Sequence, residues 1–448
     1  MPQIPIVSLT ILLLSGTSTV AIEPMLSKED TAFLKEIAEA VLQESRVAPG
    51  VSVAGAGPNT SGGVLIRPGG RDDYPAFWIR DYAMSLEAGL ITIEEQRHAL
   101  FVTAAHQPDA EIKLPTGAVL PPGSIPDHVS FGGVPIFFPG VLQDYDVQGG
   151  GQWGQLPSLD DQFFFVHMAS EYLRQSGDAA FLKEAVRGKP LLQRLAEAYA
   201  MPPSRPGTGL VYTTEEIRGV NFGFFDTVVH TGDLFFASLL KFRAAGELAV
   251  LCEAAGQPDQ SRTYLEEGDR LRQAFVPVFR LPNGWFRAST GLSAQIDVWG
   301  TAFAVYIGAL APEAERAACA ALAKALRKET IAWKGSIRHV PTDADFGPAS
   351  AWERAYAAKN RYQNGAYWPT PTGWVCFAVA RVDIGLAQKL AREYLEELRE
   401  GDFRKDAEHG SPWECMHPDG QHRQNPVYLT SVTAPLAAFH RTTGDQTP

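Results

Sequence analysis

The feature that most constrains the fold is helical periodicity, which returns along nearly the whole chain of 448 residues. In the stretch SKEDTAFLKEIAEAVLQE, the residues Phe33, Leu34, Ile37, Ala40 and Val41 fall on one face of a helix. Similar stretches span residues 82–105, 160–176, 179–199, 231–255, 260–279, 299–308, 312–327, 373–382, 386–400 and 428–441. Strand-like alternation is short and rare, as in GVLIRP and SIRHV. The pattern therefore predicts a mostly α fold of about a dozen helices.

The connections between alternate helices are long and rich in Gly, Pro and aromatic residues. They cover residues 113–144, 202–225, 334–367 and 402–427. Loops of that length are uncommon inside a compact domain unless they carry function. Short links on one side and long loops on the other predict helical hairpins arranged around an axis, with the long loops building one face. Because neither a fixed-period repeat nor a Ser/Gly-rich linker is visible, we expect residues 24–448 to form one catalytic domain.

The first 21 residues are typical of a secretory signal peptide. An apolar run from Ile6 to Leu14 is followed by small residues that end at Ala21, and only the terminal amine supplies positive charge ahead of the run. The run is well short of the roughly 20 apolar residues that a membrane-spanning helix needs. We therefore expect residues 1–21 to be a signal peptide, the protein to be secreted or periplasmic, and the chain to have no stable membrane span.

Composition argues against two classes of partner. The net charge is −12, from 39 Lys and Arg against 51 Asp and Glu, and no basic block occurs, so nucleic acid is not an expected partner. Cys415 and the histidines near it fit no structural-zinc spacing, so no metal is expected. Buried thiols, rather than a disulfide framework, are the favoured state of the four cysteines: Cys252, Cys319, Cys376 and Cys415.

The first motif is YPAFWIRDYAMSLEAGL, which places Trp78, Arg80 and Asp81 where a loop enters a helix. One interpretation is structural, with Asp81 as the helix cap and Arg80 in an ion pair. The other is that the carboxylate and guanidinium bind adjacent hydroxyls while the indole packs against a pyranose ring. The motif alone leaves both open.

The second motif is EEIRGVNFGFFDTVVHTGDLFFASLL, in which Asp226 follows three phenylalanines. A cap or turn role is the structural interpretation. However, Phe222, Phe224 and Phe225 surround the acid with apolar surface, which disfavours a charged carboxylate and raises its pKa. A carboxylic acid that stays protonated near neutral pH is suited to act as a general acid.

Two further motifs combine large rings with polar side chains. In the stretch RYQNGAYWPTPTGWVCFAVA, amides and large rings combine at the entry to a helix: Tyr362, Gln363, Asn364, Tyr367, Trp368 and Trp374. Core packing could use the rings, but it does not call for a Gln-Asn-Gly turn among them, and the mixture suits a sugar subsite. The stretch SPWECMHPDGQHRQNPVYLT sets Glu414 between a tryptophan and a Pro-Asp-Gly turn. A surface loop is the simplest setting for Glu414, and a cleft wall on the side of the long loops is the functional one.

Taken in order, these four motifs resemble the signature segments of the (α/α)6-barrel glycoside hydrolases, which include glucoamylases, trehalases, mannosyl-oligosaccharide glucosidases and debranching α-glucosidases. The resemblance extends from about Tyr74 to Phe439 and is most specific in the third and fourth motifs. It implies an all-α (α/α)6 toroid whose long loops form the active-site face. It also implies a glycoside hydrolase, with specificity like that of an α-glucosidase, that needs no metal or organic cofactor.

The resemblance also implies roles for individual residues. Asp226 matches the proton donor and Glu414 matches the base that activates water, an inverting arrangement. Phe225 stands where a tryptophan often precedes the acid, and Asp160, Asp161, Glu215 and Glu216 are competing acids. The pocket is expected to be lined by Trp78, Arg80, Asp81, Trp153, Gln363, Asn364, Tyr367, Trp368 and Trp413.

Other reactions on the same fold remain open. A sugar epimerase or polysaccharide lyase would abstract a carbon-bound proton with His or Tyr bases, for which His167, His230 and His417 are available. A carbohydrate-binding protein without activity is a third possibility, because fold does not fix function. The sequence leaves undecided which sugar and anomer are recognised, whether cleavage is exo or endo, and the oligomeric state.

Overall fold

The computed structural model describes residues 24–71, 74–114, 117–137, 140–141, 154–218 and 223–443. The predicted signal peptide and Trp153 lie outside these ranges. Twelve α-helices occur in the described residues: α1 (Lys28–Ser45), α2 (Ile79–Ser85), α3 (Ile93–Ala105), α4 (Asp161–Ser176), α5 (Leu191–Ala200), α6 (Phe235–Ala254), α7 (Pro258–Phe279), α8 (Val298–Tyr306), α9 (Pro312–Arg327), α10 (Thr372–Ala380), α11 (Ile384–Glu400) and α12 (Thr430–Thr443).

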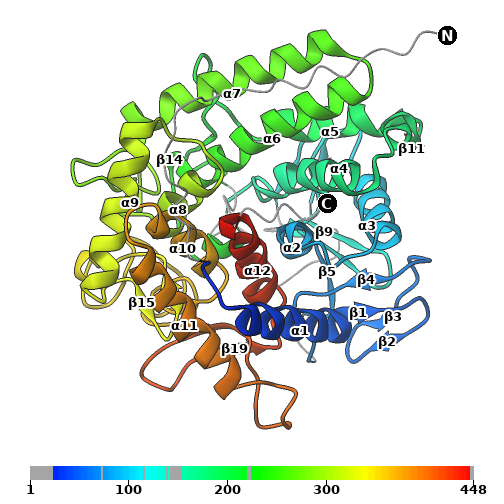
Figure 1. Cartoon of the computed structure of the whole chain (residues 1–448). Helices are drawn as coiled ribbons and strands as arrows, with labels where there is room; N and C mark the ends of the chain where they lie inside the picture. The colour runs from blue at the N-terminus through cyan, green and yellow to red at the C-terminus, as the bar shows by residue number, and fades with distance from the viewer. Residues whose placement is uncertain are drawn as a thin grey trace, which may run out of the picture.

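The even-numbered helices form a closed inner ring. Each packs against the next even-numbered helix, and α12 packs against α2 to close the circle. The odd-numbered helices lie outside this ring, each against one or two inner helices, so that α1, α7, α9 and α11 occupy the rim in Figure 1. The inner helices α8 and α10 are almost wholly buried, as expected of helices that are apolar on all sides. This is an (α/α)6 toroid, and the predicted fold class is confirmed.

Two of the predicted helices are each interrupted. Residues 82–105 hold both the inner helix α2 and the outer helix α3, because Gly89 adopts a left-handed conformation (φ 71°) and Thr92 begins α3 with a capping box. Residues 179–199 begin with a short 3-10 helix and a two-stranded turn, and only α5 remains α-helical. Gly188 (φ 84°) forms that turn. Amphipathic spacing runs through both breaks, so periodicity alone does not locate them.

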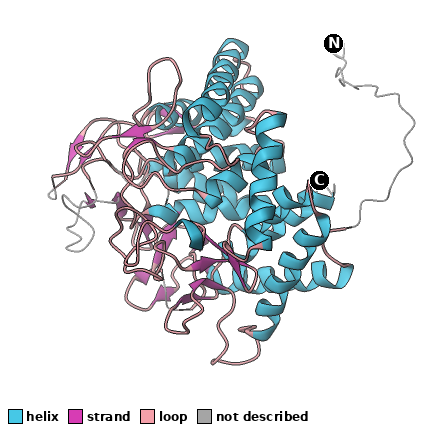
Figure 2. Cartoon of the chain, turned by 90° about the vertical axis from the view of Figure 1, so that its left-hand side faces the viewer, coloured by secondary structure: helices cyan, strands magenta, loops and turns pink. Residues whose placement is uncertain are grey.

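The strands are short and gather with the long loops on one side of the ring, as Figure 2 shows. One sheet has the order β15 (Ala332–Trp333), β16 (Ser336–Arg338), β17 (Tyr367–Trp368), β18 (Trp413–Met416) and β19 (Arg423–Pro426), all antiparallel. A second has the order β10 (Gly140–Val141), β9 (Pro135–Phe137), β8 (His128–Ser130) and β5 (Ala76–Trp78).

The remaining strands form two-stranded pairs: β1 (Arg46–Val47) with β4 (Leu65–Ile66), β2 (Ser52–Val53) with β3 (Gly57–Pro58), β6 (Ile112–Lys113) with β7 (Val119–Leu120), β11 (Ala185–Val186) with β12 (Lys189–Pro190), and β13 (Tyr212–Thr213) with β14 (Gly232–Asp233). Within the described ranges, no helix is long and apolar enough to cross a membrane. All four cysteines are buried with free thiols.

Candidate active site

The candidate site is built from segments that lead into the inner helices. Arg80 and Asp81 open α2, Asp161 opens α4, and Asp226 lies just before β14 and α6. Gln363 precedes α10, and Glu414 on β18 precedes α12. Because the inner helices surround one axis, the segments at their starts converge although they are far apart in sequence.

Arg80 is the centre of a buried ion-pair network. Its Nε donates to Asp160 Oδ2 at 2.9 Å, and its Nη2 donates to Asp161 Oδ2 at 3.0 Å. Its Nη1 donates to Asp127, which also bonds His128 Nδ1 at 2.7 Å. All five side chains of this network are less than 10% exposed, so they hold one another in place out of contact with solvent.

Burial and pairing separate the acids of this network. Burial alone would raise the pKa of Asp127, but Arg80 and His128 lower it to about 2. Burial raises the pKa of Asp161 well above its usual range although Arg80 opposes the shift. Ser158 donates a hydrogen bond to Asp161. Asp160 and Asp161, two of the competing acids, are thus bound to a guanidinium.

Asp81 and Trp78 lie on the side of the site that faces α12. The Tyr428 hydroxyl donates to Asp81 Oδ1, and burial raises the pKa of Asp81 to about 6 although Tyr428 and Arg80 lower it. The Trp78 indole stacks on the His128 ring with centroids 4.1 Å apart and meets Tyr74 edge-on at 4.8 Å. Asp81 is not the N-cap of α2: the helix begins at Ile79 with Trp78 as the N-cap residue, and Asp81 lies within its first turn.

Glu414 is a buried carboxyl, only 1% exposed, on β18. Its Oε1 accepts hydrogen bonds from the Tyr74 hydroxyl at 2.6 Å and the Tyr362 hydroxyl at 3.4 Å. Its Oε2 accepts from the amide of Asn425, which the register of β18 and β19 sets directly opposite. Burial raises the pKa of Glu414 to about 8, against the hydrogen bonds from Tyr74 and Asn425. The surface-loop interpretation of Glu414 is therefore wrong.

All three residues that donate to Glu414 have left-handed backbone conformations. The φ angles are 55° at Tyr74, 46° at Tyr362 and 47° at Asn425. Such angles are uncommon outside glycine and cost about 1–3 kcal/mol where they occur in bulky residues. Strained residues cluster at functional sites when the surrounding structure holds them in place.

Asp226 follows the 3-10 helix η3 (Gly223–Phe225). Its Oδ1 is buried and has no hydrogen-bond partner within the part of the chain that the structure describes. Burial raises the pKa of Asp226 to about 7, although the Gln363 side chain and Arg80 lower it. Gln363 is itself held by the backbone N–H of Thr227 at 2.8 Å, so the motif residue Gln363 positions the segment that carries Asp226.

Two adjacent residues link the segments that carry Asp226 and Glu414: Tyr362 donates to Glu414, and Gln363 accepts from Thr227, the residue after Asp226. The charge of Asp226 raises the pKa of Glu414, and both carboxyls raise the pKa of Tyr362. The charges of Arg80 and Asp127 in turn act on Asp226. Folding thus brings together two acids that are far apart in the sequence.

Other residues expected in the pocket have structural surroundings. Asn364 accepts from Ala351 N and donates to Ala357 O, both at 2.8 Å, and thereby closes a loop. Trp368 is fully buried and donates to Tyr362 O at 3.4 Å. Trp413 lies under the Arg423 guanidinium, 5.9 Å from the ring centroid, and strand alternation turns it to the opposite face from Glu414.

The remaining candidates are dispersed. Tyr367 lies in a separate cleft beside Trp333. Glu215 and Glu216 are exposed, and Glu215 pairs with Arg218 at 3.2 Å. His167 bonds Glu247 on α6, His230 meets the Trp352 ring edge-on, and His417 lies in the turn after β18. The three histidines considered for an epimerase or lyase therefore sit in three different surroundings.

Five site residues were not predicted from sequence: Tyr74, Asp127, His128, Asn425 and Tyr428. Tyr74 begins the first motif, four residues before Trp78, and Asn425 and Tyr428 follow Glu414 within the fourth, so both motifs held the signal. Asp127 and His128 lie in a long loop without a motif, and only the pairing of β8 with β5 brings them to Trp78. Among the described residues, no group of three His, Cys, Asp or Glu side chains could hold a metal ion.

The inner and outer rings of helices form an (α/α)6 toroid, and the chain shares this fold with solved structures of glycosidases. No family model matches the sequence, and no curated protein matches it. Several solved structures match the fold of this chain. A glycosidase variant in complex with glucose is 15% identical, with a TM-score of 0.55, 94% of this chain covered and 99% of the other.

Two further structures agree with this fold. The glucoamylase of Hormoconis resinae is 16% identical, with a TM-score of 0.55, 93% of this chain covered and 74% of the other. A rhamnosidase from Klebsiella oxytoca with rhamnose bound is 14% identical, with a TM-score of 0.55, 94% of this chain covered and 65% of the other. At such identities the likeness establishes the fold, and the chemistry has to be argued from the residues of the site.

Proposed function

We propose that the protein is an exported glycoside hydrolase that cleaves a neutral glycoside by inversion. The observation that carries the proposal is the pair of desolvated carboxyls, Asp226 and Glu414, which act on each other in one buried, tyrosine-lined site. A general acid and a general base in one site are the requirement of a single displacement. The similarity of the fold to glycosidases supports the same conclusion.

In this proposal Glu414 is the general base. Three donors, Tyr74, Tyr362 and Asn425, all point at its oxygens. Hydrogen bonds from neutral donors favour the carboxylate over the protonated acid. An ionised Glu414 accepts a proton from a water molecule as that water attacks the anomeric carbon, and Tyr74 holds the carboxylate in the orientation that this transfer needs.

Asp226 is the general acid. Its partnerless Oδ1 leaves the carboxyl able to donate a proton to the glycosidic oxygen, and burial keeps it protonated up to a pKa of about 7. The pKa values alone favour the reverse assignment, because Glu414 is the more basic of the two. The hydrogen bonds favour the assignment proposed here, because both oxygens of Glu414 accept hydrogen bonds whereas Oδ1 of Asp226 accepts none from the described residues.

The remaining polar residues bind the sugar. Asp81 presents a carboxylate for hydroxyl groups beside the Trp78 ring, and Arg80 acts by holding Asp127, Asp160 and Asp161 in place. Three acids, Asp127, Asp160 and Asp161, already pair with the Arg80 guanidinium in the described site, which disfavours an anionic sugar. An α-glucosidase-like specificity is proposed on the likeness to a glucoamylase and to a glycosidase with bound glucose. Export is proposed on the first 21 residues.

The test is a proton NMR time course with a panel of neutral oligosaccharides. The proposal predicts hydrolysis in which the first-formed anomer has the configuration opposite to that of the cleaved bond. Retention of configuration contradicts the single displacement. An isomerised or unsaturated product indicates an epimerase or a lyase, and binding without turnover indicates a protein that only binds sugar.

A further inference from the structure

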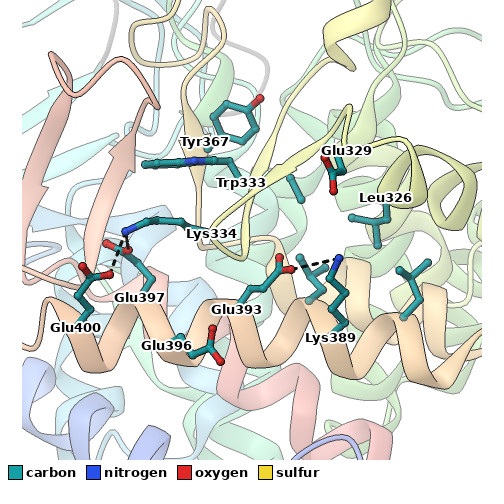
Figure 3. Close-up of a pocket in the computed structure, with 13 residues that line it drawn as sticks. Leu326, Glu329, Trp333, Lys334, Tyr367, Lys389, Glu393, Glu396, Glu397 and Glu400 are labelled. Atoms are coloured by element: carbon teal, nitrogen blue, oxygen red, sulfur yellow. Dashed lines mark hydrogen bonds and ion pairs between the residues drawn. The ribbon is translucent and has the colours of Figure 1, made fainter.

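A cleft of about 480 Å³ opens between the hairpin of β15 and β16 and the outer helix α11, as Figure 3 shows. Trp333 and Tyr367 form its upper wall. Lys389, Glu393 and Glu396 come from successive turns of α11 on its lower wall. The volume falls within the range of small-ligand sites, which is about 300–1,000 Å³. The chemistry described above makes no use of this cleft.

The hairpin that carries Trp333 is pressed rigidly onto α11. Lys334 (φ 47°) and Gly335 (φ 73°) form its two-residue turn, the conformation that such hairpins favour. A Cβ on Gly335 would lie 2.2 Å from the backbone of Tyr394. Lys334 Nζ donates to Glu397 at 2.7 Å and to Glu400 at 3.0 Å. The backbone that carries Trp333 is thus held in place before any ligand binds, which reduces the entropy cost of binding.

The lining suits a neutral, hydroxyl-rich ligand. The partly exposed Trp333 ring lies 6.2 Å from Tyr367, centroid to centroid, and offers an apolar face. Five glutamates and two lysines line the cleft, an excess of three negative charges that disfavours an anion. A cationic ligand over the indole would be repelled by the ammonium group of Lys334, whose Nζ lies 5.7 Å from the ring centroid. Paired carboxylates and amines remain as acceptors and donors for hydroxyl groups.

The cleft and the candidate active site share one sheet. Trp333 pairs with Ser336, Arg338 with Tyr367, and Tyr367 with Met416. Paired residues and residues two apart in a strand fall on the same face, so Trp333, Tyr367 and Glu414 belong to one face of this sheet. Three strand spacings separate β15 from β18, or about 14 Å. This is the separation across the sheet, and the two-residue steps along β16 and β18 add to it, so only a glycan of several sugar units could contact both places.

We infer that this cleft is a second glycan-binding subsite, in which Trp333 stacks against non-reacting sugar units of an extended neutral oligosaccharide. The inference rests on the proposed glycosidase function for the nature of the occupant. It predicts that long glycans gain affinity from the cleft, whereas a disaccharide confined to the catalytic pair gains none.

The test uses the Glu414→Gln variant, so that substrate is not consumed, and isothermal titration with maltoheptaose, cellohexaose and mannohexaose. We expect Trp333→Ala to weaken binding of at least one of them about tenfold or more, and Trp333→Tyr to restore most of it. Phe346→Ala, a change at another exposed aromatic residue (63% exposed), is the control and should leave binding unchanged. Melting curves confirm that each variant is folded.

In the Glu414-containing enzyme, Trp333→Ala should lower kcat/KM about fivefold or more on the long substrate and leave the corresponding disaccharide within twofold of wild type. The inference is overturned if the Glu414→Gln protein binds all three oligosaccharides equally well with and without Trp333→Ala. It is also overturned if Trp333→Ala weakens the binding of spermidine and of no glycan. If the enzyme binds glycans through Trp333 yet hydrolyses none, the proposed function fails and the cleft stands. If the enzyme hydrolyses disaccharides but Trp333→Ala changes neither binding nor kcat/KM on long substrates, the glycan-binding cleft is wrong and the proposed function is retained.

Discussion

At the residue scale, the two carboxyls of the site differ in the hydrogen bonds that their oxygens accept. Glu414 receives three hydrogen bonds from residues in strained backbone conformations, and Asp226 has an oxygen that receives none. These left-handed conformations cost free energy, so we expect them to persist because they direct the three donors toward the Glu414 carboxyl. The orientation of Glu414, rather than its mere presence, is the property that the fold maintains.

The substitution Tyr74→Phe tests this orientation. The Tyr74 hydrogen bond lowers the pKa of Glu414, so its loss should raise that pKa above about 8. The wild-type pH profile should be bell-shaped with limbs near 7 and 8, and in the variant the upper limb, which follows the more basic group, should move to higher pH. We expect kcat to fall about 10- to 100-fold.

Tyr362→Phe is the matched control for that experiment, because its hydroxyl lies 3.4 Å from Glu414 rather than 2.6 Å. Its effect on the upper limb should be smaller. Equal shifts in the two variants, or no shift in either, would show that Tyr74 does not set the protonation of Glu414.

How much the sequence reveals also differs from residue to residue. Glu414, Asp226, Asp81 and Gln363 are found from motifs, since the polar types stand out beside large rings. Asp127 and His128 are not found, because their place depends on strand pairing between segments about 50 residues apart.

At the element scale, helices follow from the sequence far better than strands do. A helix of three turns or more leaves a periodic record of its buried face, as in α11, whereas strands of two residues leave none. Of the five-stranded sheet that carries Glu414, only β16 leaves a sign in the sequence, in the alternation of the stretch SIRHV. The other four strands cannot be recognised there, although their loops are evident. The cleft beside β15 is a property of this sheet and α11 together.

The contact between the β15–β16 hairpin and α11 can be tested with a pair of glycine substitutions. Gly335→Ala places a methyl group 2.2 Å from Tyr394 and also strains a left-handed position, so the free energy of unfolding should fall by about 2 to 4 kcal/mol. Gly89→Ala has the same kind of φ angle with no atom within 4 Å, and should cost about 1 kcal/mol. Urea titrations measure both. Equal losses would mean that the hairpin is not pressed against α11.

At the scale of the whole molecule, closing the ring buries acids that would otherwise be charged. Burial raises the pKa of Asp81 to about 6, of Asp226 and Asp297 to about 7, and of Glu414 to about 8. Below the unfolded pKa near 4 these groups are neutral in both states. Above it the unfolded chain releases protons that the folded chain retains, so stability should fall as pH rises from about 4 to 8.

Asp297 offers the cleanest test, because it caps α8 away from the catalytic pair and one of its oxygens lacks a hydrogen-bond partner in the described structure. The substitution Asp297→Asn should raise the melting temperature at pH 8 and make little difference at pH 4. Asp343→Asn, at an exposed position, should change neither. A variant less stable than wild type at pH 8 would contradict the account of the buried acids.

The central claim is that Asp226 supplies the proton and Glu414 activates the water, and leaving-group dependence tests it most directly. The measurement compares hydrolysis of an oligosaccharide with hydrolysis of the glycosyl fluoride of the same sugar, whose leaving group needs no proton. We predict that Asp226→Asn loses about a thousandfold on the oligosaccharide but stays within about tenfold of wild type on the fluoride, whereas Glu414→Gln loses about a thousandfold on both. Equal losses on both substrates in Asp226→Asn, or fluoride hydrolysis preserved in Glu414→Gln, would contradict the claim.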